Sequence, residues 1–417
     1  MAHILIWSIS AGSIVLMLFR PFSVPEVVWT AGGALLLCFL KLIPWRLAGH
    51  AISEGMDVYL FLTGMMMLSE LGKVHGLFDW LANIAVKRGD GSPTRLFTLI
   101  YGVGTVVTIF MSNDATAVVL TPAVLTAVKR AQVKPLPYLL ICATIANAAS
   151  FVLPISNPAN LVVFDSVMPS LSRWLAMFAL PSIVSIVVTY LLLRWYCRKE
   201  MTDPREIVDP EVRLSSAGKI TLFGILSVAV VLLIASAVKM DLGLPACLAS
   251  LVVTALVLIQ ERSNPRHIIR DISWSVLPLV AALFVIVEAV KSTGALQVFQ
   301  IALLHAMQWP AVVSTFTVGV ILGFGTNLVN NLPLGLIAGA SLRSVPFHPI
   351  LAKAVLIGVD LGPNLSITGS LATILWLIAI RREGLHMSGW QFLKAGMIVM
   401  PTSLALTLGT TLLLGSH

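Results

Sequence analysis

Charged residues are scarce in this chain. Asp, Glu, Lys and Arg together make up only 11% of its 417 residues, whereas a soluble domain carries about 25%. Hydrophobic residues make up 58%, so the composition excludes a soluble protein and indicates a polytopic membrane protein. The net charge of +8 does not indicate nucleic-acid binding, because the basic residues lie in short loops between apolar runs. There they orient a membrane protein and can contact anionic lipid.

Cysteine is also rare, and the sequence motifs of enzymes are missing. The cysteines are Cys38, Cys142, Cys197 and Cys247; they lie far apart without metal-ligand spacing, so we expect no disulfide and no metal site. No His-Glu-x-x-His cluster or nucleophile motif is present, so we expect neither enzyme activity nor a cofactor. Soft-metalloid binding by Cys142, or by the run Met65 to Met67, is an alternative to simple apolar packing.

Apolar runs long enough to cross a bilayer, about 17–25 residues each, are abundant. The first is interpreted as a membrane helix and not as a signal peptide, because no basic segment precedes it. These runs are residues 3–19, 24–43, 56–72, 137–167, 172–197, 217–238, 244–260, 272–291, 349–380 and 389–414.

Two further apolar regions, 95–130 and 311–343, are interrupted in the middle by polar signatures. The signatures are Ser112-Asn113-Asp114 and Val329-Asn330-Asn331. Polar groups at bilayer depth cost several kcal/mol unless they line a site. We therefore expect each region to be a re-entrant helical hairpin, which enters the membrane, turns at its polar tip and leaves on the same side. Two ordinary spanning helices are the alternative.

The second half of the chain repeats the first at a nearly constant offset, which indicates duplication. We expect an all-α membrane fold of two inverted repeats, residues 1–198 and 217–417, joined by a cytoplasmic linker at 199–216. Each repeat would hold five transmembrane helices, one re-entrant hairpin and one amphipathic segment (Leu77 to Lys87 and Ala295 to Gln308). The matching positions are Pro25 and Pro245, Glu70 and Glu288, Lys73 and Lys291, Gly76 and Gly294, Asn113 and Asn330, and Asn147 and Asp360.

The distribution of Lys and Arg predicts the orientation in a plasma membrane, the inner membrane of a bacterium. The linker region carries Arg194, Arg198, Lys199, Arg205, Arg213 and Lys219, so it should be cytoplasmic. Five spans per half then place both termini outside and invert the second half. An inverted repeat provides two mirror-related states, which is the structural basis of alternating access.

Two polar, Pro-containing breaks follow the hairpins. One runs from Asn147 to Pro158, and the other from Asp360 to Ser370. Proline removes a backbone donor and leaves carbonyl groups that need another partner. Discontinuous helices in corresponding places of two halves indicate a transport site at the membrane midplane, although a kink without a role in binding is an alternative.

These four interruptions supply the candidate site residues. Asp114 lies near a helix start, where it could cap the helix, but a carboxylate at membrane depth is functional by default. Removal from water favours the neutral form of a carboxyl group, so Asp114 and Asp360 are candidate proton carriers. The four segments contain no Lys or Arg, so a neutral polyhydroxy solute suits them better than a dicarboxylate anion. The candidate substrate-binding residues are Ser112, Asn113, Thr116, Asn147, Ser150, Asn157, Asn330, Asn331, Asn364, Ser366 and Thr368.

Two acidic–basic pairs lie near helix ends. Glu70 with Lys73, and Glu288 with Lys291, have the i,i+3 spacing of neighbours on one helix face. We interpret both as interfacial pairs whose long side chains reach toward water.

Three segments resemble a known family. Phe110-Met-Ser-Asn-Asp-Ala-Thr116, Val329-Asn-Asn-Leu-Pro333 and Asp360-Leu-Gly-Pro-Asn364 with Thr368-Gly-Ser-Leu-Ala-Thr373 resemble the arsenical pump membrane proteins. These are arsenite/antimonite efflux permeases of the ion transporter superfamily. The resemblance covers essentially the whole chain. It implies export of arsenite and antimonite, as neutral As(OH)3 and Sb(OH)3, in exchange for protons, in some members with a soluble arsenite-stimulated ATPase subunit.

Asn147 departs from that family, whose members often carry Asp at this position. The departure puts the number of transported protons in doubt and leaves sodium coupling open. A sodium/proton antiporter or a sodium-coupled carboxylate carrier of the same fold is therefore the main alternative. A passive channel for neutral metalloids is another.

Overall fold

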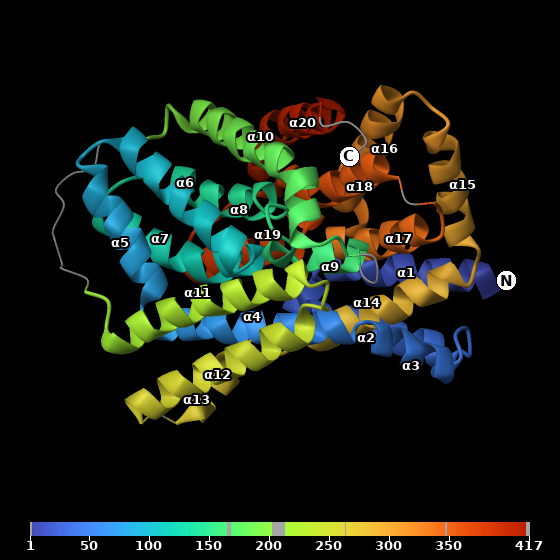
Figure 1. Cartoon of the computed structure of the whole chain (residues 1–417), viewed down its shortest axis with the longest axis horizontal. Coiled ribbons are helices and arrows are strands. Elements are labelled where there is room, and N and C mark those ends of the chain that lie inside the picture. The colour runs from blue at the N-terminus through green and yellow to red at the C-terminus, as the bar shows by residue number, and fades with distance from the viewer. Residues whose placement is uncertain (1, 165–167, 202–212, 263, 347, 414–417) are drawn as a thin grey trace.

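The computed structural model describes residues 2–164, 168–201, 213–262, 264–346 and 348–413, and within these it is all-helical (Figure 1). Ten α-helices belong to each half of the chain. In the first half they are α1 (Ala2–Phe19), α2 (Glu26–Phe39), α3 (Trp45–Glu54), α4 (Met56–Val74), α5 (Leu77–Gly89), α6 (Pro93–Phe110), α7 (Thr121–Arg130), α8 (Leu136–Ala148), α9 (Pro158–Phe164) and α10 (Leu171–Cys197). In the second half they are α11 (Ser216–Ala237), α12 (Gly243–Glu261), α13 (Pro265–Asp271), α14 (Val276–Lys291), α15 (Ala295–Met307), α16 (Ala311–Val329), α17 (Asn331–Arg343), α18 (Pro349–Leu361), α19 (Leu371–Arg382) and α20 (Gly389–Leu413).

The predicted elements are present, including the amphipathic segments, which form α5 and α15. Helices α3 and α13 were not predicted from the sequence. Both are too short and too polar to register as apolar runs. The side chain of Asn264 accepts a hydrogen bond from the Arg266 N–H at the start of α13, which is a local capping signal.

The number of long spanning helices is smaller than the ten apolar runs suggest. Six described helices are long and apolar enough to cross a membrane, or up to eight if each bent pair of helices is one span. The runs 137–167 and 349–380 are each divided into two short helices, and α1, α2 and α8 are shorter apolar helices. These two divided runs are the ones in which polar breaks were predicted, so the expected discontinuous helices are present.

The packing of the two halves is reciprocal. Helix α4 packs against α12, and its counterpart α14 packs against α2. Helix α9 contacts α17, α19 contacts the segment before α7, and α10 lies beside α20 (Figure 1). This exchange of equivalent partners is what two intertwined repeats would produce. The domain boundaries and the inversion remain predictions, and most of the linker, residues 202–212, lies outside the described part of the chain.

Small residues allow a close helix contact between the halves. A Cβ atom on Gly64 of α4 would lie 2.6 Å from the carbonyl oxygen of Ala246 on α12. The carboxylate of Asp57 also accepts a 2.6 Å hydrogen bond from the Gly243 N–H, which satisfies a free donor at the start of α12. Close backbone approach at small residues is typical of helix packing in membranes.

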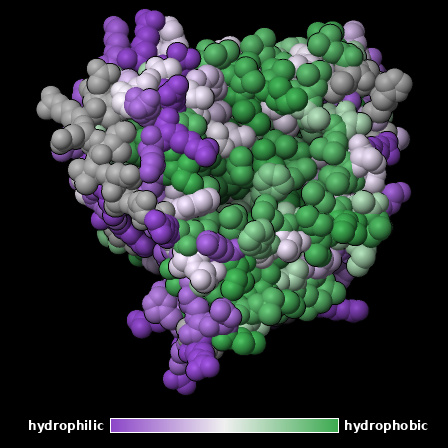
Figure 2. All heavy atoms as spheres, turned by 60° about the vertical axis from the view of Figure 1, so that its left-hand side comes forward, coloured by the Kyte–Doolittle hydropathy of each residue, from purple (hydrophilic) through white to green (hydrophobic). Residues whose placement is uncertain are grey.

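The outer surface carries a broad apolar face (Figure 2). Phe223, Val230 and Ile234 on α11 and Val252 and Leu256 on α12 are all more than half exposed. Hydrophilic groups border this face. An apolar surface of this extent suits contact with lipid and not with water.

Candidate functional site

The first polar tip lies between α6 and a π-helical segment, η2 (Ala115–Leu120), which leads into α7. Ser112 has a positive φ of 144°, and its hydroxyl accepts a hydrogen bond from the Ala115 N–H at 3.3 Å. Thr108 and Thr116 share a 2.8 Å hydrogen bond across the turn, so the chain folds back as expected. Ser112 therefore caps the second helix, and the side chain of Asp114, for which capping was the alternative, makes no capping hydrogen bond.

The second tip is formed by Asn330, between α16 and α17. Its φ is 74°, its side-chain oxygen accepts a hydrogen bond from the Leu332 N–H, and its amide nitrogen donates to the Thr368 carbonyl at 3.2 Å. Asn331 is buried in the first turn of α17. The two tips therefore resemble each other, each with a positive φ and a side-chain cap immediately before the second helix, although the sequence comparison paired Asn113, and not Ser112, with Asn330.

Amide side chains satisfy the carbonyl groups that the helix breaks expose. Three carbonyl groups between α8 and α9 accept hydrogen bonds from the side-chain nitrogen of Asn160, which lies in α9. They belong to Ser150, Leu153 and Pro154. In the break between α18 and α19, Asn327 of α16 donates to the Gly362 carbonyl at 3.1 Å. A proline break needs such partners at this depth, so the sequence carries a structural amide for each break.

Further hydrogen bonds connect the break between α18 and α19 to Asn327, close to the second tip. The hydroxyl of Ser366 donates to the Asn327 side-chain oxygen at 2.7 Å, and that of Thr368 donates to the Asn327 backbone carbonyl at 2.9 Å. Ser366 and Thr368, both predicted to bind substrate, thus act here as internal hydrogen-bond donors.

The buried carboxyl group of Asp360 is held by the opposite half of the chain. Ser150 donates to one of its oxygens at 2.7 Å and Asn157 to the other at 3.0 Å. The Ser150 hydroxyl also lies 2.7 Å from the Asn147 carbonyl oxygen. One hydroxyl proton cannot be donated to both oxygens at once. A proton on the Asp360 carboxyl would satisfy both short contacts, because Asp360 could then donate to Ser150.

Asn147 makes the reciprocal contacts. Its amide nitrogen donates to the side-chain oxygen of Asn364 at 3.0 Å and to the Thr373 hydroxyl at 3.3 Å, both in the second half. The Asn147 side-chain oxygen and the Asn364 side-chain nitrogen have no hydrogen-bond partner. Buried polar atoms normally have a hydrogen-bond partner. These two atoms are exceptions, so each could still form a hydrogen bond.

A small cavity, which we call the tip cavity, lies where the two tips meet the two breaks. It contains about 360 Å³ of empty space, including its open part, and is lined among others by Asn113, Asp114, Asn157, Asn331 and Ser370. Amide, hydroxyl and carboxyl groups from four segments therefore converge there. The predicted grouping of tips and breaks is consistent with this arrangement.

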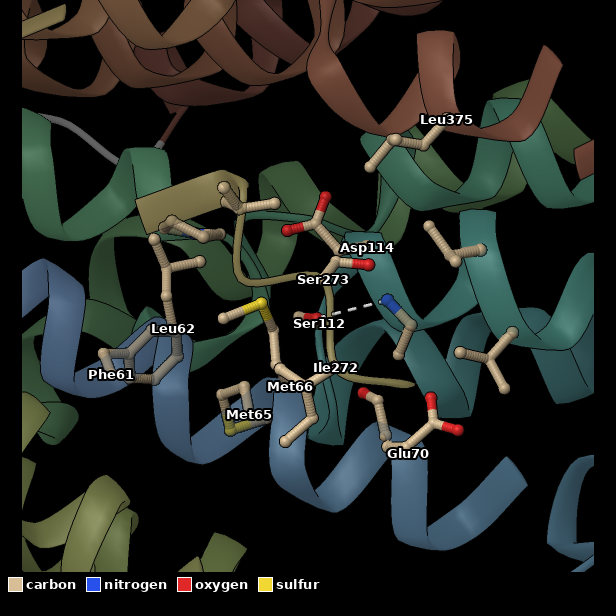
Figure 3. A pocket seen from close by; sticks show the side chains of 16 residues that line it. Phe61, Leu62, Met65, Met66, Glu70, Ser112, Asp114, Ile272, Ser273 and Leu375 are labelled. Atoms are coloured by element: carbon tan, nitrogen blue, oxygen red, sulfur yellow. Dashed lines mark hydrogen bonds between the residues drawn. The ribbon is translucent and has the colours of Figure 1, made fainter. Parts of the chain in front are cut away.

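A larger cavity, the Glu70 cavity, adjoins it (Figure 3) and contains about 620 Å³ of empty space, part of it open to the outside. Asp114 lines both cavities and has no hydrogen bond or ion pair with any described residue. No Lys or Arg lines either cavity in the described part of the chain. The accessible polar groups are therefore neutral or acidic.

The predicted site residues divide into groups that only the structure separates. Those that line a cavity are Ser112, Asn113, Asp114, Asn157 and Asn331. Those that lie in hydrogen-bond networks behind it are the buried Thr116, Asn147, Ser150, Asn330, Asp360 and Asn364 and the partly buried Ser366 and Thr368. Asn157 connects the groups, because it lines the tip cavity and donates to Asp360.

Sequence reasoning missed several polar residues. Asn160, Asn327, Ser370 and Thr373 support the breaks through the hydrogen bonds that they make. Glu70 was interpreted as half of an interfacial pair, but its side chain is buried and lines the large cavity. The recurrence of this glutamate as Glu288 in the second half of the chain could have indicated a functional role for Glu70.

Helices broken at facing sites, an apolar outer surface and cavities in which a few polar side chains converge are typical of a membrane transporter. The chain belongs to the citrate transporter family, whose sequence profile matches residues 14–358.

Individual relatives are distant but cover most of the chain. An arsenical pump membrane protein of Escherichia coli (strain K12) is 25% identical over 368 residues, which is 82% of this chain and 83% of that protein. A putative arsenical pump membrane protein of Bacillus subtilis (strain 168) is 23% identical over 95% of this chain and 96% of its own length. Among solved structures, the YdaH transporter of Alcanivorax borkumensis matches with a TM-score of 0.55 and 16% identity, over 90% of this chain and 88% of that one. This last match shows the fold alone.

Proposed function

We propose that this protein is a secondary active exporter of trivalent arsenite and antimonite, taken as neutral As(OH)3 and Sb(OH)3, in exchange for protons. It would act in a plasma membrane, with its linker in the cytoplasm and both termini outside. The observation that carries the proposal is the unpaired carboxyl group of Asp114 in cavities lined by no Lys or Arg. The arsenical pumps of E. coli and B. subtilis among its relatives support the choice of substrate.

The charge of the cavities favours an uncharged solute. Citrate and similar carboxylates are anions near neutral pH, and binding them usually requires arginine or lysine partners. A trihydroxide both donates and accepts hydrogen bonds, as do the amides of Asn113, Asn157 and Asn331 and the hydroxyl of Ser370 that line the tip cavity. The neutral substrate therefore fits the accessible groups better than an anion does.

The two aspartates suit different parts of proton coupling. Asp114 lines both cavities, where solute and proton could compete for it. Asp360 lies behind the tip cavity and is connected to it through Asn157. The hydroxyl of Ser150 has two competing acceptors, which favours a proton on Asp360 in this state. We propose that protonation of Asp360 is linked through Asn157 to binding at the tips.

The test is arsenite uptake into everted membrane vesicles from cells without other arsenite exporters. An acid-inside pH gradient, imposed without ATP, should drive uphill uptake, and a sodium gradient alone should not. A collapsed gradient should abolish accumulation. Downhill equilibration without any response to the pH gradient would contradict the exchange mechanism and indicate a passive channel.

A sodium-coupled carboxylate carrier is the second candidate. The name of the citrate transporter family favours a carboxylate substrate. The unpartnered side-chain oxygen of Asn113 beside Asp114 is a type of ligand that sodium accepts. The same vesicles separate the two candidates. Sodium-dependent citrate uptake without arsenite uptake would support the carboxylate carrier and refute the arsenite proposal.

A further inference from the structure

A second cavity occupies the place in the other half that corresponds to the Glu70 cavity. We call it the Glu288 cavity; it contains about 440 Å³ of empty space, including its open part. Val276 and Leu375 line the Glu70 cavity, and their repeat equivalents Val58 and Val162 line the Glu288 cavity. Each cavity therefore contains an equivalent glutamate and is built partly from the opposite half, but Lys291 and Arg343 also line the Glu288 cavity, whereas no described Lys or Arg lines the Glu70 cavity.

The two cavities differ in their access to the polar tips. The Glu70 cavity reaches Ser112 and Asp114, whereas no tip residue lines the Glu288 cavity. Helices α17 and α9, which both line the Glu288 cavity, pack tightly against each other. A Cβ on Gly339 would lie 2.7 and 2.8 Å from the carbonyl oxygens of Val163 and Val162. The Glu70 cavity thus extends to a tip, whereas the Glu288 cavity does not.

Glu70 lies on the open path in a defined position. Its side chain is only 8% exposed, and both of its oxygens accept hydrogen bonds from Lys73, at 3.0 and 3.1 Å. Lys73 is half-exposed. Figure 3 shows Glu70 and Asp114 at opposite ends of the cavity, with Ser112 between them. A pair that served only to reach water would expose both charges, so the burial of Glu70 within a cavity requires another explanation.

The open path begins at the linker end of the molecule. Glu70 is near the end of α4, and a Cβ on Gly218 at the start of α11 would lie 3.0 Å from the carbonyl oxygen of His75. With the linker in the cytoplasm, solute leaving the cell would meet Glu70 before Asp114.

We propose that Glu70 forms an entrance subsite for the hydroxylated solute. Its carboxylate, oriented by Lys73, accepts hydrogen bonds from the solute hydroxyl groups, and Ser69 and Ser273 line the same cavity. Glu288, held by Lys291 at 2.6 Å, forms the corresponding subsite on the outer side when the molecule opens there. This inference rests on the proposed function and extends it to the path by which the solute enters.

The test compares initial arsenite uptake in everted vesicles, where the cytoplasmic face is outside. Glu70→Gln keeps the shape of the side chain but removes its charged acceptor. KM should rise about tenfold, the loss expected for one charge-assisted hydrogen bond, with the maximal rate within about twofold of wild type. Glu383→Gln is the matched control, because Glu383 is an exposed partner of Lys129 outside both cavities and should leave KM unchanged.

The reverse direction supplies a second readout. In right-side-out vesicles, Glu288→Gln should raise the KM for arsenite entering from outside, and Glu70→Gln should not. Glu70→Asp keeps the carboxylate and should recover part of the affinity, which separates binding from folding. An unchanged KM for Glu70→Gln, or an equal rise on both sides, would overturn the entrance role. Wild-type vesicles that take up no arsenite would instead refute the proposed function and the entrance role together.

Discussion

The hydroxyl of Ser150 and the carboxyl of Asp360 form a 2.7 Å hydrogen bond across 210 residues of sequence. Both side chains are fully buried, and they come from helix breaks in opposite halves of the chain. The bond therefore connects the two breaks directly, and its strength depends on the relative position of the halves.

Removal of this bond should weaken both the fold and transport. Ser150→Ala leaves an Asp360 oxygen without its partner, so we expect a loss of about 1–2 kcal/mol in the free energy of unfolding. Thermal unfolding in detergent measures the effect. Ser227→Ala is the control, because that hydroxyl is exposed and donates only to the Phe223 carbonyl of its own helix. Equal stability of the two variants would contradict the structural importance of the Ser150 bond.

Loss of either aspartate's charge should affect proton coupling more than stability. Asp114→Asn should leave the unfolding temperature close to that of wild type, because the carboxyl group has no partner among the described residues. It should nevertheless abolish the response of arsenite uptake to an imposed pH gradient. Asp241→Asn, at an exposed loop position, is the control.

Asp360→Asn should abolish the same pH-driven uptake, since an amide cannot carry the proton. Its stability should stay close to that of wild type, because the new amide nitrogen can donate to Ser150, as a protonated carboxyl group would, while the amide oxygen accepts from Asn157. Full proton-driven uptake by this variant would remove Asp360 from the coupling mechanism.

Replacement of Asn147 by an acidic residue should destabilise the protein less than replacement by an apolar residue. In Asn147→Asp, Asn364 can rotate its amide, so that its currently unpartnered nitrogen donates to the new carboxyl group. Asn147→Leu loses both cross-half bonds, to Asn364 and Thr373, and should cost about 2–3 kcal/mol. Thermal unfolding of both variants checks this order, and greater stability of the leucine variant would contradict it.

The contact between α9 and α17 should not accommodate a larger residue. Gly339→Ala would press a methyl group against two backbone carbonyls, so we expect strong destabilisation or separation of the two helices. Gly102→Ala is the matched control, because nothing lies within 4 Å of a Cβ on this helical glycine. That change should be neutral or stabilise the protein by up to about 1 kcal/mol. An equal shift of the unfolding temperature in both variants would show that the contact between α9 and α17 is not tight.

The sequence by itself determined the local elements of this protein. Hydrophobic runs, the polar tips at Ser112 and Asn330 and the breaks near Pro154 and Pro363 follow from the composition of short segments, because a helix in lipid satisfies its backbone within the segment. The repeated positions also indicated which parts correspond between the halves. These predictions needed no knowledge of packing.

Only the tertiary structure decided which polar side chains face a cavity and which support the breaks. Asp114 and Asp360 appear equivalent in the sequence, yet one is unpaired in a cavity and the other is bonded to the opposite half. Glu70 appeared to belong to the surface and lies inside. The physical reason is that burial and bonding partners depend on helices brought together from distant parts of the chain, which short-range patterns do not encode.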